Sequence, residues 1–255
     1  MKLRRNWTGL LLGVALPIGL LCFHTGCAAQ TEPENTAEEL QALYTAAVRD
    51  AVLADTDEIQ PLVCLTHEDG RTVWDEDGER VLLLSMNYDP DSYPAGEDIT
   101  FHGGEIWAFS GGEMADWYAE NQKGVTDWSL RMNQLLGLPA DLVHTHISAF
   151  WVKPEDVIRP AYTTDVTVQI DPALEKRWEE GSWYDGWFDA NILYSYFDSA
   201  FPWTRLGYTY DWADNGREYG LTEFLVYPDT EVTIEYTVTI EEFIAGLAAA
   251  EASKA

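Results

Sequence analysis

The sequence predicts an α+β fold, a single domain with an antiparallel sheet flanked by helices. Two observations predict it. From Pro61 onward, short apolar runs are separated by turn residues, and helical patterns are interspersed among them without the regular strand-helix alternation of parallel sheets. The content of 46% hydrophobic residues is sufficient for a packed core. We expect a signal peptide over residues 1–26, a tether over 27–35 and one domain over 36–255, because no repeat or internal linker is evident.

The N-terminus has the pattern of a lipoprotein signal. Lys2, Arg4 and Arg5 precede an apolar run over 10–23, and a short segment then ends at Cys27. The run is shorter than the roughly 20 residues that a spanning helix needs. We therefore expect Cys27 to carry acyl chains, such as palmitate, that hold the protein on the outer side of the cell membrane. A plain secretory signal is the alternative.

The charge excludes one class of partner. The chain has a formal net charge of -29, which becomes -32 when the three basic residues of the signal leave. Such a surface repels phosphate backbones, so we expect no nucleic acid partner, and contact with the membrane only through Cys27. With Cys22 removed and Cys27 acylated, Cys64 has no cysteine partner, so no disulfide is expected.

The first predicted elements are a helix and a meander. Thr36 and Glu39 form a capping box before an apolar periodicity that extends to Val52. Short apolar runs follow at 62–66, 73–74 and 80–86, separated by Asp- and Gly-containing turns. We interpret these runs as strands of an antiparallel meander.

The middle of the chain mixes both element types. Runs at 106–109 and 146–152 predict strands, and the stretch 113–121 predicts a helix. A further helix should begin at a Thr126 cap and end at Gly137. Residues 154–156 start a helical turn.

The last third has a strand, helix, hairpin and helix pattern. The Val and Thr content of 163–170 predicts a strand, and residues 183–198 predict an aromatic helix. Segments 219–227 and 231–240 are expected to pair as a closing hairpin. A helix over 241–252 ends the chain.

An aromatic cluster is the strongest candidate for a binding site. Residues 183–212 contain 12 aromatic side chains, where the chain average of 13% predicts about four. Their rings would stack on a sugar face, and Arg205 would donate to a carboxylate or hydroxyl. The alternative is that the rings fill the core. The ligand-binding candidates are Trp183, Trp187, Trp203, Arg205, Tyr208, Tyr210 and Trp212.

His144 and His146 are candidate metal ligands. In a strand, residues two apart share a face, so both imidazoles are able to reach one ion. No third ligand is identified, and surface or structural histidines are the alternative. No cofactor is assigned.

Four segments resemble a family of uncharacterised bacterial proteins. They are QLLGLP at 134–139, FWVKPED at 150–156, PWTRLGYTYDW at 202–212 and GLTEF at 220–224. The resemblance covers about residues 105–227 and implies a shared fold. The family has no established activity, so no catalytic role is carried over.

Residues 222–230 are similar to the strand-and-turn ending of ADP-ribosyltransferases. That similarity implies Glu223 as the catalytic residue, although Leu221 occupies the position of the paired acidic or amide residue and no Ser-Thr-Ser segment precedes it. The alternative is a strand that runs into a turn.

The sequence predicts a cell-surface lipoprotein that binds an extracellular glycan or small polar ligand. A secreted enzyme is the competing prediction, either this transferase or a glycan hydrolase with an unassigned carboxylate pair. A structural lipoprotein without a ligand pocket is the third.

Overall fold

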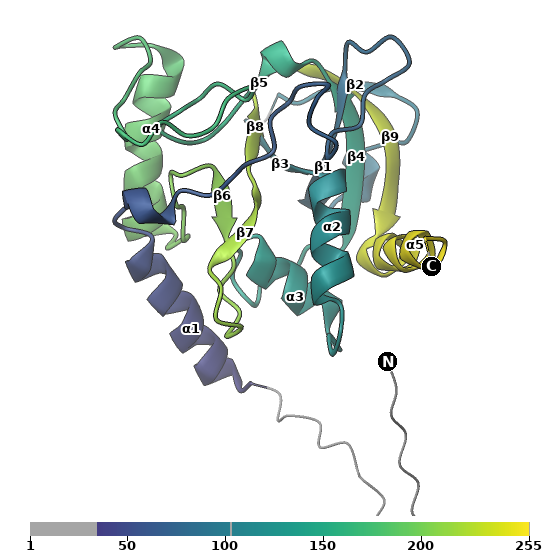
Figure 1. The fold of residues 1–255 in the computed structure, drawn as a ribbon, viewed down its shortest axis with the longest axis horizontal. Helices are drawn as coiled ribbons and strands as arrows, with labels where there is room; N and C mark the ends of the chain where they lie inside the picture. Colours follow the sequence, from purple (N-terminus) through teal and green to yellow (C-terminus); the bar gives the residue numbers. More distant parts are fainter. Residues whose placement is uncertain (1–34, 103, 255) are drawn as a thin grey trace, which may run out of the picture. The chain divides into compact units, whose positions relative to one another are not determined.

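The computed structural model describes residues 35–254 with the exception of Gly103, and these residues form one compact unit around a seven-stranded sheet (Figure 1). The predicted signal, with Cys27, and residues 27–34 of the predicted tether lie outside the described residues. The sheet order is β2-β9-β4-β1-β3-β8-β5, and every pairing is antiparallel. Its strands are β1 (Val81–Asn87), β2 (Asp98–Thr100), β3 (Ile106–Ser110), β4 (His146–Val152), β5 (Val157–Ile158), β8 (Phe224–Val226) and β9 (Glu231–Thr239). The predicted α+β class is confirmed.

A small second sheet and five helices complete the described fold. The second sheet pairs β6 (Tyr208–Tyr210) with β7 (Tyr219–Thr222). The helices are α1 (Ala37–Asp50), α2 (Gly111–Asn121), α3 (Trp128–Leu135), α4 (Trp183–Leu193) and α5 (Ile240–Ala252), and α4 continues as a π-helical segment, Tyr194–Asp198. Single 3-10 turns lie at Thr56–Glu58, Pro90–Ser92 and Pro154–Asp156. None of the described helices is long and apolar enough to cross a membrane.

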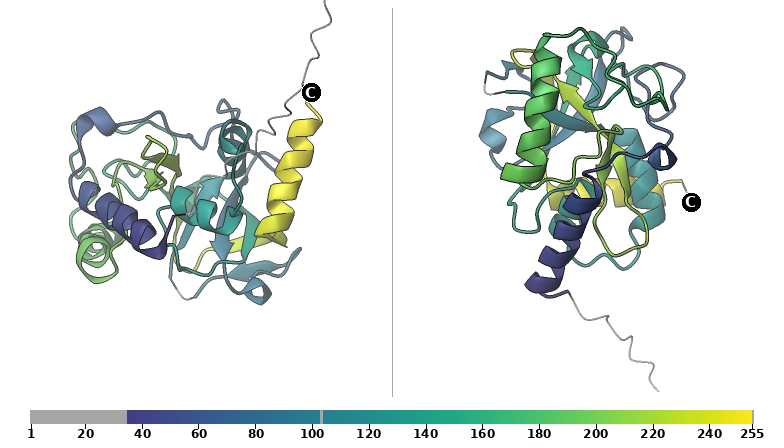
Figure 2. Two further views of the ribbon diagram at one scale, coloured as in Figure 1. Left: turned by 90° about the horizontal axis from the view of Figure 1, so that it is seen from below. Right: turned by 90° about the vertical axis from the view of Figure 1, so that its left-hand side faces the viewer.

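The central strands are buried on both faces because their side chains alternate between two cores. On β1, Val81 and Leu83 point into one core, whereas Leu84 points into the other. Helices α2, α3 and α5 cover the second face, where Met114, Met132 and other apolar side chains pack (Figure 2). Because both faces are covered, β1 reads as a continuous apolar run rather than as an alternating one.

A one-residue bulge allows β9 to serve both cores. Ala149 pairs with Tyr236, but Phe150 pairs with Ile234, so Glu235 is an extra residue in β9. Ile234 consequently packs in the first core and Tyr236 against the second, although both carry even numbers.

The terminal helices begin at the capping residues that their sequences indicate. Thr36 and Glu39 form the predicted capping box of α1. Thr239 and Glu242 form a second one at α5. The prediction for α3 was wrong by one residue, because the Asp127 carboxylate, rather than Thr126, accepts from the Leu130 N–H.

The predicted closing hairpin is wrong. Strand β8 pairs with β3 and β5, and β9 pairs with β4 and β2, so the two segments lie in different parts of the sheet. The segment 219–227 is also divided between β7 and β8, with Glu223 at the division. A turn between two strands therefore does not decide their pairing here, because each strand finds its apolar partners elsewhere.

Two further predicted strands are absent from the described fold. Of the predicted meander, residues 62–66 form no strand, 73–74 contribute an isolated bridge from Trp74 to Val81, and the run 80–86 forms β1 as expected. Residues 163–170 wrap around the fully buried Arg159, whose guanidinium donates to the carbonyl oxygens of Asp165 and Val168. Carbonyls that satisfy a buried cation are not available to a β-ladder.

Candidate ligand-binding pocket

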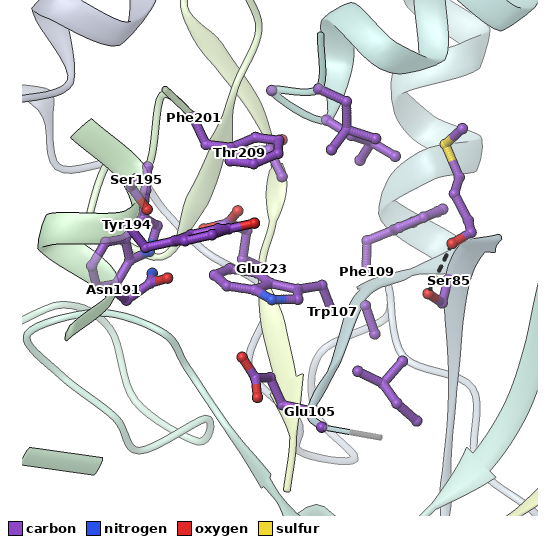
Figure 3. Close-up of a pocket in the computed structure, with 18 of the residues that line it drawn as sticks. Ser85, Glu105, Trp107, Phe109, Asn191, Tyr194, Ser195, Phe201, Thr209 and Glu223 are labelled. Carbon is purple, nitrogen blue, oxygen red and sulfur yellow. Dashed lines mark hydrogen bonds between the residues drawn. The ribbon is translucent and has the colours of Figure 1, made fainter. Parts of the chain in front are cut away.

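A cavity of about 710 Å³ lies between α4 with its π-helical extension, strand β3, and the segment that follows α3. Figure 3 shows Asn191, Tyr194 and Ser195 reaching it from one side and Phe109 from the other. Glu223 and Trp107 lie between these walls. Its volume falls within the range of about 300–1,000 Å³ that is usual for small-molecule sites.

One stripe of α4 forms a wall of the cavity. Trp187, Ala190, Asn191 and Tyr194 all line it, and this spacing of i, i+3, i+4 and i+7 places them on one helix face. Phe188, which follows Trp187 and is turned about 100° from it around the helix, is fully buried against the core. The cavity face continues into the π-helical segment, an arrangement that is frequent at functional sites.

Three tryptophan rings form a continuous aromatic surface in the cavity. Trp107, on β3, lies 5.9 Å from Trp187, and Trp187 lies 5.6 Å from Trp203, measured between ring centroids. The Trp187 indole N–H donates to Glu105 at 2.9 Å, which fixes the ring at the start of β3. Trp203 is buried and donates to the Pro160 carbonyl, so it forms the deep part of this surface.

Glu223 carries a buried carboxyl with no side-chain hydrogen bond to the described residues. It links β7 to β8, and its backbone N–H donates to the Gly207 carbonyl at 2.9 Å. Its side-chain Oε2 makes no hydrogen bond with the described residues, and only 9% of the residue is exposed. Burial raises the pKa of Glu223 to about 8. The carboxyl is therefore mostly protonated at neutral pH.

Two further polar atoms in the cavity wall lack a partner among the described residues. They are Nδ1 of His144 and Nδ2 of Asn191. Burial lowers the pKa of His144, and its ring stacks on Tyr88. Because buried polar atoms in native proteins are nearly always paired, three such atoms around one cavity indicate a site that accepts a polar molecule.

Some of the candidate residues from the sequence lie in this cavity and others do not. Trp187, Trp203, Tyr210 and Glu223 line it. Trp183 does not, since its half-exposed ring packs beside Trp187 on the outer side of α4 and against Tyr227.

The remaining three candidates serve the packing of the domain. Arg205 is buried, donates to the carbonyls of Ala51 and Val52, and does not line the cavity. Tyr208 and Trp212 are buried in two separate clusters. The aromatic residues of 183–212 therefore supply both the core and the cavity wall. Their spacing in the sequence does not distinguish the two groups.

The structure does not bring the two candidate metal-ligating histidines into one ligand cluster. His144 lines the cavity, whereas His146 begins β4 and its Nδ1 lies 2.7 Å from the Thr145 hydroxyl. Within residues 35–254, a group of three metal-type ligands is formed by Asp50, Glu58 and Glu218.

Sequence reasoning missed Glu105, Trp107 and Asn191. Trp107 carried a signal, because it alternates with Ile106 and Ala108, which belong to the buried core of the sheet. Asn191 lies four residues after Trp187, so helical spacing places both side chains on the same face of the predicted helix.

No family model, curated protein or solved structure matches this chain. This is consistent with the resemblance to uncharacterised proteins, and no established activity is shown. The function is therefore inferred from the site itself.

Proposed function

We propose that this protein is an extracytoplasmic lipoprotein, anchored by acyl chains on Cys27, whose domain binds a glycan or small polar ligand. One observation supports the binding function above all others. A cavity of about 710 Å³ combines the tryptophan surface of Trp107, Trp187 and Trp203 with the partnerless carboxyl of Glu223.

The two kinds of lining suit a ligand with one apolar face and several polar groups. Flat indole rings cover the apolar face of a sugar or a similar ring, and their burial favours association. Few polar groups in a mostly apolar pocket then fix the orientation. Glu223 and Asn191 supply such groups, because each carries a buried atom that has no hydrogen-bond partner among the described residues. Binding would satisfy atoms that the fold alone leaves unpaired.

A matched pair of tryptophan variants tests the binding function. Trp107 is 37% exposed and lines the cavity, whereas Trp183 is 44% exposed and does not. Both truncations should therefore have comparable effects on folding. We expect Trp107→Ala to weaken glycan or small-ligand binding by about tenfold or more, as loss of a stacking ring does, and Trp183→Ala to leave it unchanged.

The assay is a glycan array followed by fluorescence titration of the hits. No response from intact folded protein, or equal losses in the two variants, would contradict the proposal.

The lipid anchor is tested separately from binding. Cys27→Ser should move the protein from the membrane fraction to the soluble fraction, because the acyl chains are its expected attachment. Persistence of the variant in the membrane fraction would refute lipidation at Cys27, without bearing on the pocket.

Hydrolysis of a glycan is a second candidate function, favoured by a specific observation. Glu105 and Glu223 line the same cavity, and burial raises the pKa of Glu223 to about 8, as suits a general acid. If this function holds, wild-type protein should release reducing sugar, and Glu223→Gln should abolish release while retaining binding. Absence of turnover with a glycan that binds would reject it.

The transferase alternative has less support. Leu221, at the position of the paired residue in the ADP-ribosyltransferase pattern, is fully buried in the core beneath α2 and α5. It cannot contact a molecule in the cavity. Transfer of label from NAD that is lost in Glu223→Gln would restore this alternative.

A further inference from the structure

The cavity is lined by acidic side chains that no basic side chain of the same lining balances. Among the described residues that line it, none is Lys or Arg, whereas Glu105 and Glu223 are both acidic. The whole chain has 44 acidic against 15 basic residues, so its overall field also attracts cations toward the pocket mouth. Resting on the proposed binding function, we propose that the ligand is an organic cation, with an ammonium group that sits against the tryptophan rings beside Glu223.

No cation of the described residues lies over the rings of the cavity tryptophans. The described part of the chain has five cation-ring contacts, which involve the rings of Trp117, Trp178, Phe188, Tyr162 and Tyr196. None of these rings lines the cavity. None of the three cavity tryptophans, the ring type that binds cations best, therefore carries a cation of the described residues. Trp187 stacks on Trp183 and Tyr184 and Trp203 is buried, so Trp107, which is 37% exposed, is the ring most accessible to a positively charged ligand.

Glu223 supplies the countercharge for such a ligand. Its Oε2 is buried and has no hydrogen-bond partner among the described residues, so no arginine or lysine of residues 35–254 donates to it. A buried carboxyl ionises readily only when an opposite charge lies close to it. An ammonium ion in the cavity would fill that role, and its binding would release the proton that Glu223 holds in the free protein.

The groups that face Glu223 do not replace this countercharge. Tyr184 and Tyr196 lie within electrostatic range of it, and burial raises the pKa of both phenols, so they stay neutral. Tyr210 behaves in the same way, and the lowered pKa of His144 keeps its imidazole neutral. Glu105 adds a second acid, and Tyr194 a second phenol, to the same wall.

Paired probes of matched shape test the proposal. Choline and 3,3-dimethyl-1-butanol differ only in the charge of one quaternary centre, and glucosamine differs from N-acetylglucosamine by a free amine. Each is titrated into the full domain by calorimetry, with fluorescence as a second readout. We expect choline to bind at least about tenfold more tightly than its neutral counterpart at pH 8.5. The sugar pair is titrated at pH 7.5, where a substantial part of the glucosamine amine is protonated, and shows whether an ammonium group carried on a sugar is preferred to its neutral amide.

The pH dependence identifies Glu223 as the countercharge. Choline keeps its charge at every pH, so any change in its affinity reports on the protein. If only ionised Glu223 binds it, the affinity should rise by about 90-fold between pH 6 and pH 9, which spans the pKa of about 8. Glu223→Gln, whose amide has the shape of the protonated acid, should bind choline weakly and without this dependence. Glu76→Gln, at an exposed turn, is the control and should behave as wild type.

The outcomes separate the inference from the function on which it rests. If the neutral member of both pairs binds equally or more tightly, the proposal of a cationic ligand is wrong, and the pocket remains a binding site for neutral ligands. An unchanged pH dependence in Glu223→Gln overturns the role of that residue. No response to any of the four probes by folded protein overturns the cation proposal, and no response in the glycan array as well overturns the binding function.

Discussion

Replacing Glu223 by glutamine should make the protein more stable at high pH. In the unfolded chain the carboxyl ionises near its ordinary pKa of 4.5, whereas in the fold burial raises that pKa to about 8. The stability of the wild type is therefore complete below pH 4.5, declines as the pH rises toward 8, and is constant above it. At 1.36 kcal/mol per pH unit, the interval corresponds to a loss of about 5 kcal/mol. The amide has no such loss, because it does not ionise.

Urea denaturation of both proteins, followed by tryptophan fluorescence, measures this difference. The advantage of Glu223→Gln over wild type in the free energy of unfolding should grow by about 4 kcal/mol between pH 5 and pH 9. Other titrating groups change both proteins equally and cancel in the comparison. Glu76→Gln, in an exposed turn, should show no growing advantage. If the advantage of Glu223→Gln changed by less than about 1 kcal/mol over this range, Glu223 would ionise as freely as in the unfolded chain, and our account of the pocket would be wrong.

Three further predictions concern the stability of the domain, each measured by urea denaturation. Gly220→Ala should lower the free energy of unfolding by about 1–3 kcal/mol, because the added Cβ would lie 2.1 Å from the Thr209 hydroxyl. Gly246→Ala, in the open interior of α5, should raise it by about 1 kcal/mol. Equal effects of the two variants would contradict the packing around β7. Arg159→Met should cost at least about 3 kcal/mol, since buried carbonyls lose their donor, and a loss below about 1 kcal/mol would refute this role. Thr239→Ala should cost about 1 kcal/mol through loss of the α5 cap and Thr239→Ser much less, so equal losses would argue against capping.

A buried acid that lowers stability at neutral pH suggests a functional reason for keeping it. Hydrophobic or amide side chains would fill the position of Glu223 at no such cost, yet the sequence places a carboxyl there. Exchanges of stability for function are concentrated at binding and catalytic sites. This supports the search for ligands in the aromatic pocket before any other surface.

Local patterns in the sequence predicted the elements that depend on neighbouring residues. The capping box at Thr36 and the apolar run of β1 were readable, because the causes lie within a few residues along the chain. The segment 163–170 was misread because its carbonyls are claimed by Arg159, a residue outside the pattern of the segment itself. Pairing between β8 and β9 was misread for the same reason, since the partners are distant in sequence.

The sequence by itself determined the class of fold, the capping box of the first helix, the acidic character of the domain and the presence of an aromatic-rich region. Only the tertiary structure decided which rings face a cavity and which face the core. Trp203 and Trp212 look alike in the sequence, yet one lines the cavity and the other packs against Tyr44. The physical reason is that burial and the pKa of Glu223 depend on which distant segments enclose a side chain, and the long-range packing of α4 against β3 and β8 sets that enclosure.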